Sequence, residues 1–496
     1  LPKRSHFLPK TQTFLHYLIL SGISLFLANI FQSPISSVSS SGLLTIAILF
    51  FCISSFSKRV GIAVFFACFF TFQLAGTFIP FLLGDNEWNM GLTDREFIVT
   101  CNCLFLSCVV LIFTTIFLEK YKLVWGSVHD VNLAMLKDHS YNLHSIQKWA
   151  FLICIVSSLI AIVGETQAMF HAISHGYISM YDDYSSSALV NRMQLISKAS
   201  MFIGLAANPS KKRAWTYFFL ALPVAVMNLV EGSRTGVMTL ILFFIYYFYS
   251  YADWGKRIVS AKEKKKRNRR LIIICIGIVC LIAPFLYVYG YTRVGNAVRG
   301  SSNPVMLIFQ FFGSQGGSAK LIGWAERYKG ELPGLCYSLG SIVDRIQGNH
   351  FTSFTVESAI NTNSFGYVMS YLNSPYNFTV LHTGVGSSYV AEVYYDFGYV
   401  GLLIVNIVIS SVLKQLTTFG KSRVLVKGII FSVFYYMLTI PRAPLLLPVD
   451  NVLSLSSIMT FLVIFVLSKR RVVFNGKNQG SAVDSRILYG RGRESS

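Results

Sequence analysis

Residues 382–403 read HTGVGSSYVAEVYYDFGYVGLL. The stretch passes from glycines and serines, through Glu392 and Asp396, into a run apolar enough for lipid. That run continues to about residue 416, and a hydrocarbon core roughly 30 Å thick needs about 20 apolar residues per helical span. The stretch therefore predicts a membrane helix that carries two acidic residues at its outer end.

The same apolar signal recurs along the whole chain. Of its 496 residues, 53% are hydrophobic and 13% are charged, whereas a soluble domain carries about 25% charged residues. We expect an all-α, polytopic membrane helix bundle of about 12 spans. The expected spans are residues 12–31, 41–57, 60–83, 98–118, 149–166, 190–207, 214–231, 235–251, 271–290, 398–416, 428–440 and 451–468, of which the sixth and eleventh are the weakest.

The net charge of +21 does not require a nucleic-acid partner. Twelve spans place both termini on one side of the membrane, and with the termini inside most Lys and Arg residues fall in cytoplasmic segments. This distribution is the positive-inside bias of membrane proteins. The basic run at 262–270, KEKKKRNRR, fits a cytoplasmic topology anchor. The sequence therefore predicts a membrane protein with cytoplasmic N- and C-termini.

One loop is much longer than the others. We divide the chain into spans one to nine at 1–290, a periplasmic cap loop at 291–397, spans ten to twelve at 398–468 and a disordered cytoplasmic tail at 469–496. A structureless loop of about a hundred residues is unusual, so the cap is expected to fold and to carry function. Its segments NPVMLIFQFFG and GGSAKLIGWAERYKG are predicted as amphipathic helices along the membrane surface.

The sequence contains no soluble-enzyme signature such as a P-loop, a GxSxG elbow or zinc-spaced Cys and His residues. We therefore expect no cofactor and no metal site. Basic residues instead gather at the expected outer boundary, where charged groups are costly and usually functional. The candidate substrate-binding residues are Arg234, Arg293, Arg299, Arg345, His350, His382 and Arg442.

Four of these candidates also have a structural interpretation. Arg234, in the turn EGSRTG, is equally explained by an arginine that extends to the lipid headgroups. Arg345 and His350 are better explained as solvated surface residues, and they stay candidates because Gly348 and Asn349 form an adaptable turn beside them. Arg442 lies between Pro441 and Pro444, where it is as well explained as a fixture of a helix end. Arginines gathered in this way nevertheless suit a lipid-linked phosphate, to which they give bidentate contacts.

Glu392 and Asp396 are the candidate catalytic residues. They lie four residues apart, so a helix that begins near Ser388 places them on one face. Such carboxylates are best tolerated beside arginines or where a proton must be taken up. A carboxylate there can accept the proton of an attacking sugar hydroxyl.

The order of these features resembles the O-antigen polymerase (Wzy) family. The resemblance rests on the GSRTG turn after a hydrophobic run, the large late outer loop and the segment 382–403. It implies a GT-C-like bundle and an enzyme that joins oligosaccharide repeat units linked to undecaprenyl diphosphate at the periplasmic face of the inner membrane. It also implies that Arg234, Arg293 and Arg299 hold the diphosphate, and that membrane lipid and a chain-length regulator are partners.

Two other functions stay open at this point. An O-antigen ligase shares the bundle and the cap but uses the lipid A core as its acceptor. A polysaccharide flippase or transporter usually places charges near the bilayer midplane and shows two related halves. Here the charges gather at one face, which favours the enzyme over the transporter.

Overall fold

The computed structural model describes residues 8–121, 142–175, 187–230, 235–251, 261–292, 303–349, 354–415 and 424–469. This part of the chain is all-helical, as the sequence predicts. Its first half consists of α1 (Leu8–Phe31), α2 (Pro34–Ser54), α3 (Phe56–Phe69), a π-helical turn η1 (Phe70–Leu74), α4 (Ala75–Leu82), α5 (Asp94–Tyr121), α7 (Leu143–His175), α9 (Ala188–Ala206), α10 (Lys211–Val230), α11 (Thr235–Tyr251) and α12 (Ala261–Thr292).

The second half begins with short helices and ends with long ones. It consists of α13 (Pro304–Gln315), a 3₁₀ turn η3 (Gly316–Ala319), α14 (Lys320–Arg327), α15 (Gly340–Gln347), α16 (Val356–Asn361), α17 (Phe365–Asn373), α18 (Pro375–Thr379), α19 (Tyr389–Gln415), α20 (Val424–Met437), a 3₁₀ turn η5 (Ile440–Arg442), α21 (Leu447–Val452) and α22 (Leu455–Ser468).

The expected membrane spans coincide with helices. Among the described residues, eight helical segments are long and apolar enough to cross a membrane: 12–31, 34–54, 58–82, 94–121, 143–175, 211–230, 389–415 and 424–442. Three more expected spans fall on the shorter apolar helices Thr235–Ser250, Cys280–Gly290 and Leu455–Ser468. The remaining one, 190–207, falls on α9, which contains Arg192 and Lys198. The chain is therefore a polytopic membrane protein.

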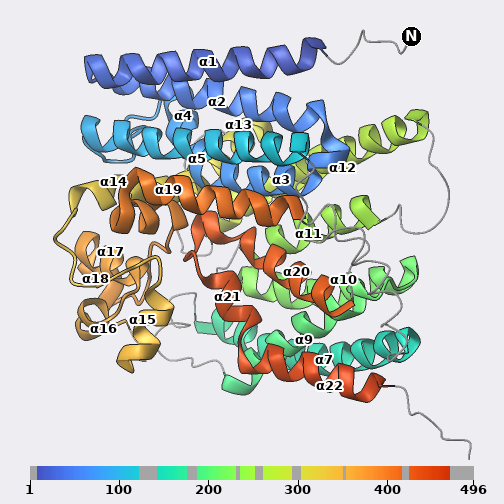
Figure 1. Ribbon diagram of the computed structural model, residues 1–496. Helices are drawn as coiled ribbons and strands as arrows, with labels where there is room; N and C mark the ends of the chain where they lie inside the picture. The colour runs from blue at the N-terminus through green and yellow to red at the C-terminus, as the bar shows by residue number, and fades with distance from the viewer. Residues whose placement is uncertain are drawn as a thin grey trace, which may run out of the picture.

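The helices lie side by side, and the short helices gather at one end of the bundle (Figure 1). We call this end, where α14 to α18 lie, the cap end. The start of α1 and the end of α22 both lie at the opposite end (Figure 1). Helix α19 runs from the cap end to the opposite end, so residues at its start and at its finish lie in different environments.

The two segments predicted as amphipathic helices are helical, and their apolar residues pack on the bundle. Helix α13 begins with Asn303, whose side chain accepts a hydrogen bond from the backbone N–H of Val305, and with Pro304 at its first position. Both residue types favour the start of a helix. Helix α13 packs against α12 and α4, and α14 buries its apolar residues against α5 and α19.

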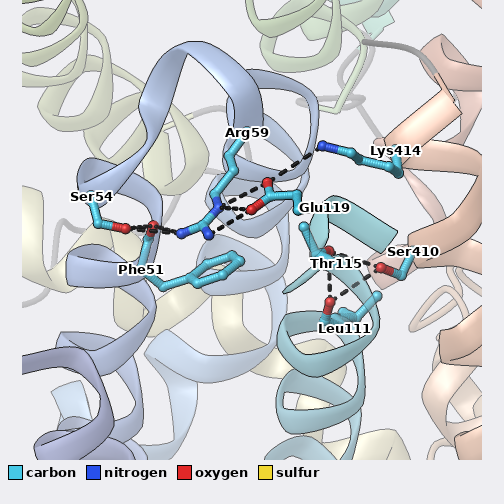
Figure 2. Close-up of polar contacts among 8 residues, drawn as sticks. All are labelled: Phe51, Ser54, Arg59, Leu111, Thr115, Glu119, Ser410 and Lys414. Atoms are coloured by element: carbon cyan, nitrogen blue, oxygen red, sulfur yellow. Dashed lines mark hydrogen bonds and ion pairs between the residues drawn. The ribbon is translucent and has the colours of Figure 1, made fainter. Parts of the chain in front are cut away.

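The end of α19 opposite the cap is fixed by buried polar contacts (Figure 2). Ser410 donates from its hydroxyl to the carbonyl of Leu111 over 3.1 Å. Glu119 accepts from Arg59 at 2.7 Å and lies 3.4 Å from the Lys414 ammonium. These groups come from α3, α5 and α19, so the contacts fix the positions of three helices relative to one another at this end.

A candidate active site at the start of α19

The π-helical turn η1 brings a glutamine into the interior of the bundle. It joins α3 to α4 within the segment 58–82, and π turns of this kind occur frequently at functional sites. The Gln73 side chain is fully buried. Its Nε2 donates to the Ser388 hydroxyl over 2.9 Å and to the Pro441 carbonyl. Gln73 therefore joins the residue before α19 to the turn η5.

Glu392 lies one turn into α19 and is 1% exposed. Its Oε1 accepts a hydrogen bond from the Ser387 hydroxyl over 2.5 Å, and its Oε2 accepts from the backbone N–H of Leu445 over 2.9 Å. Both of these partners are neutral. A carboxyl group that is removed from water and held by neutral donors is expensive to bury, which marks Glu392 as the prominent acidic group of this region.

Arg442 ends η5 and lies beside the same segments. Its Nη1 donates to Oε1 of Gln315 over 2.9 Å, and its guanidinium carbon lies 5.6 Å from the centroid of the Phe72 ring. Pro441 is buried, and Arg442 itself is partly exposed. Gln73 donates to the Pro441 carbonyl, and Glu392 accepts from the Leu445 N–H. Arg442 therefore lies between two residues whose backbone groups are held by side chains of η1 and α19. The structure thus brings Glu392 and Arg442 into one neighbourhood.

Asp396 lies one turn further along α19, and its carboxylate binds the cap. It accepts hydrogen bonds from the backbone N–H groups of Tyr337 at 3.1 Å and Ser338 at 2.6 Å, and from the Cys336 thiol at 3.3 Å. Burial raises the pKa of the Cys336 thiol, so the thiol stays protonated and can donate. The contacts of Asp396 therefore hold the segment that leads into α15.

Arg345 and His382 lie in the cap with partners of their own. Nη2 of Arg345 lies 2.9 Å from Oδ1 of Asp450, and its side chain is 59% exposed. His382 has a left-handed backbone conformation with φ of +47°. Its ring stacks on Phe354 with centroids 5.9 Å apart. The ion pair joins α15 to α21, and the ring contact lies in the loop that leads into α19.

Four predicted site residues, Arg234, Arg293, Arg299 and His350, lie outside the described residues. Two of them directly adjoin described helices. Arg234 directly precedes α11, and Arg293 directly follows α12. Gly236, in the first turn of α11, lines a small cavity of about 40 Å³ together with Gln194, Lys198 and Asn228. Gly236, the last residue of EGSRTG, therefore lies at this cavity.

The sequence did not identify the neutral residues that connect the site, nor the ion pair between Arg327 and Glu96. Gln73, Gln315 and Ser387 connect the site, but an uncharged polar residue inside an apolar run gives no signal of its partner. Arg327 binds Glu96 through two hydrogen bonds of 2.8 and 2.7 Å. Here a signal existed, because Thr93 to Glu96 read TDRE, the pattern of a capping box at a helix start.

A comparison with protein families bears on these observations. The family model described as O-antigen polysaccharide polymerase Wzy matches residues 12–473, which includes every membrane segment and the cap. No curated protein and no solved structure matches the chain.

Proposed function

The chain belongs to the O-antigen polysaccharide polymerase family Wzy, and we propose that its active site is the neighbourhood of Glu392 and Arg442 at the start of α19. Members of the family polymerise O-antigen from lipid-linked oligosaccharide repeat units. In the proposed reaction, a glycan leaves undecaprenyl diphosphate and joins the next lipid-linked unit. The single observation that supports this site is a buried carboxyl group with neutral partners, one of which is the backbone N–H of Leu445, three residues after Arg442.

Each step of the proposed transfer has a group in the chain to perform it. A hydroxyl oxygen of the acceptor sugar attacks the anomeric carbon of the donor, and its proton passes to the Glu392 carboxylate. The bond between the anomeric carbon and the diphosphate oxygen breaks, and its electron pair leaves with the diphosphate. Arg442 stabilises the charge on that leaving group, because preorganised cationic donors are effective where charge develops.

The remaining candidates complete this proposal. Arg234 directly precedes α11 and Arg293 directly follows α12. We assign these two and Arg299, six residues after Arg293 in the sequence, to the diphosphate, and we assign Arg345, His350 and His382 in the cap to the glycan. Asp396 stays a candidate for a catalytic role through its position one turn from Glu392. The cap end would face the periplasm, and both chain termini would face the cytoplasm of a Gram-negative cell.

Glu392→Gln tests the proposal while it preserves the shape of the side chain. Loss of a general base lowers the rate by about 10²-fold or more, so we expect lipopolysaccharide with a single repeat instead of a ladder. The measurement is the ladder of a deletion strain that carries the variant gene, with membrane abundance checked by immunoblot. Glu357→Gln, at an exposed acid of the cap helix α16, is the matched control and should restore the full ladder.

The same lipopolysaccharide gel distinguishes the proposed polymerase from a ligase. A ladder of normal length from Glu392→Gln would remove the carboxyl group from the mechanism. Accumulation of long polymer on undecaprenyl diphosphate in the deletion strain would instead indicate a ligase.

A further inference from the structure

We propose that an apolar cavity between η1, α11, α12 and α13 binds the isoprenoid chain of the lipid-linked substrate, with its diphosphate head at Arg442. This inference rests on the proposed function, since it locates the lipid part of the same substrate. The cavity has a volume of about 200 Å³ and is partly open. It is lined by side chains from all four elements.

The lining of the cavity suits a hydrocarbon chain. Phe70, Ile241, Ala283 and Phe311 are representative, and within the described lining only Thr71 and Gln315 carry polar side chains. An apolar cavity does not hold water, but it accepts apolar ligands. Phe70 to Phe72 belong to the membrane segment 58–82, and α11 and the apolar part of α12 are shorter apolar helices, so the cavity lies among the apolar helices of the bundle.

Two lining residues of the cavity contact Arg442, which does not itself line it. Gln315 lines the cavity and accepts a hydrogen bond from Arg442. Phe72 also lines the cavity, and the Arg442 guanidinium lies over its ring. Acidic side chains are absent from the described lining. The cavity therefore matches a ligand with an apolar chain and an anionic head.

The head end of the cavity leads to the candidate active site. Gln73 follows Phe72 in η1 and binds both Ser388 and the Pro441 carbonyl. A diphosphate at Arg442 would thus lie near the start of α19, where Glu392 is. An isoprenoid diphosphate is the occupant that fits, because it is the lipid whose head carries the bond to be broken.

Helix α11 separates this cavity from a smaller one. Val237 and Ile241 line the apolar cavity, whereas Gly236 and Leu240 line a pocket of about 40 Å³ that also contains Lys198. The smaller pocket has only a fifth of the volume, so the larger cavity, on the side of α12 and α13, is the one that suits a hydrocarbon chain.

Photolabelling of the full-length protein in nanodiscs tests the inference directly. The probe is a polyprenyl diphosphate with a diazirine on an isoprene unit near the head and with no glycan. We expect labelled peptides from α11 and α12, located by mass spectrometry. Unlabelled polyprenyl diphosphate should compete, and phosphatidylglycerol should not. Equal competition by phosphatidylglycerol, or label on other helices only, would overturn the assignment.

A pair of α12 variants adds a matched control. Ala283→Trp fills the cavity and should lower labelling of α11 and α12 by about tenfold, as expected from a loss of about 1.4 kcal/mol of binding free energy. Leu281→Trp, at a side chain that is 77% exposed, should leave labelling unchanged. If Ala283→Trp fails to fold, labelling of the wild-type protein still decides the question.

Labelling requires no turnover, so the lipid site and the catalytic proposal can fail separately. The Glu392→Gln variant should label as the wild type does. Label in the cavity together with a normal ladder from Glu392→Gln would retain the lipid site and discard the proposed base. No label in the cavity together with a lost ladder from Glu392→Gln would discard the lipid site and retain the proposed base.

Discussion

Two carboxylates one helical turn apart have different surroundings. Glu392 binds a serine hydroxyl and one backbone N–H inside the bundle, whereas Asp396 binds two backbone N–H groups and a thiol of the cap. The first has two donors, and the second has three. The second has the arrangement of a residue that positions a loop. The difference is expected to appear in their variants.

Asp396→Asn should impair the cap more than the chemistry. The amide keeps one acceptor oxygen but turns N–H groups toward donors of segment 336–338, and each lost hydrogen bond to a charged group is worth about 1.5–3 kcal/mol. We expect a lower melting temperature in detergent and a fainter ladder whose residual rate varies with pH as the wild-type rate does. A normal melting temperature with no polymer would instead make Asp396 catalytic.

At the residue scale, sequence reasoning finds charged groups but not the residues that connect them. Glu392 and Arg442 stand out because charge at a membrane boundary is costly. Gln73 does not, because its partners Ser388 and Pro441 are 315 and 368 residues away. Only folding brings these segments together. The sequence alone therefore predicts candidates, and the grouping of Glu392 with Arg442 comes from the structure.

At the element scale, the contacts at the far end of α19 set its register (Figure 2). The side chains of Arg59, Glu119 and Lys414 are only 10%, 16% and 14% exposed. Glu119→Gln would leave two cations without their carboxylate, and breaking such a buried pair costs about 3 kcal/mol. We expect a lower melting temperature in detergent. Glu331→Gln, at an exposed residue, is the control and should melt as the wild type does.

The turn η3 and the start of α4 approach each other backbone to backbone. A Cβ atom on Gly316 would lie 2.0 Å from the backbone nitrogen of Gly76, whereas one on Gly317 would meet nothing within 4 Å. Gln315 directly precedes this approach, and its helix α13 also contacts η1. Gly316→Ala should therefore separate η3 from α4 and reduce both membrane abundance and polymer, as measured by immunoblot and ladder. Gly317→Ala should restore both, and equal behaviour of the two variants would refute the role of the close approach.

Most helices could be predicted because lipid imposes a simple requirement on composition and length. The runs at 12–31 and 98–118 need no knowledge of their neighbours. The start of α19 could not be placed from apolarity alone, because the helix begins at Tyr389 and continues through a non-helical Gly398 with φ of +60°. The turn η1 leaves no trace in the sequence, since a π turn depends on packing rather than on residue type.

At the scale of the whole molecule, the two ends of the bundle differ in charge. The end opposite the cap includes the end of α22, because the N–H of Asn142, just before α7, donates to the carbonyl of Ser468. It also includes the start of α10, because Gln147 donates to the carbonyl of Asn208. Basic residues gather there: Lys58, Arg59, Lys148, Lys211, Lys212, Arg213, Lys414 and Lys469. By the positive-inside rule, this end is expected to face the cytoplasm.

Cysteine labelling in spheroplasts tests this orientation. In a Cys336→Ser background, which keeps a donor for Asp396, Glu357→Cys places a thiol on the exposed surface of α16 and Lys212→Cys places one at the start of α10. A membrane-impermeant maleimide should modify the α16 thiol in intact spheroplasts and the α10 thiol only after permeabilisation, as read from a mass shift. The positive charge at the far end requires this pattern, since reversal would place the basic residues outside. Labelling of the α10 thiol in intact spheroplasts would invert the topology, and it would move Glu392 and Arg442 to the cytoplasmic face.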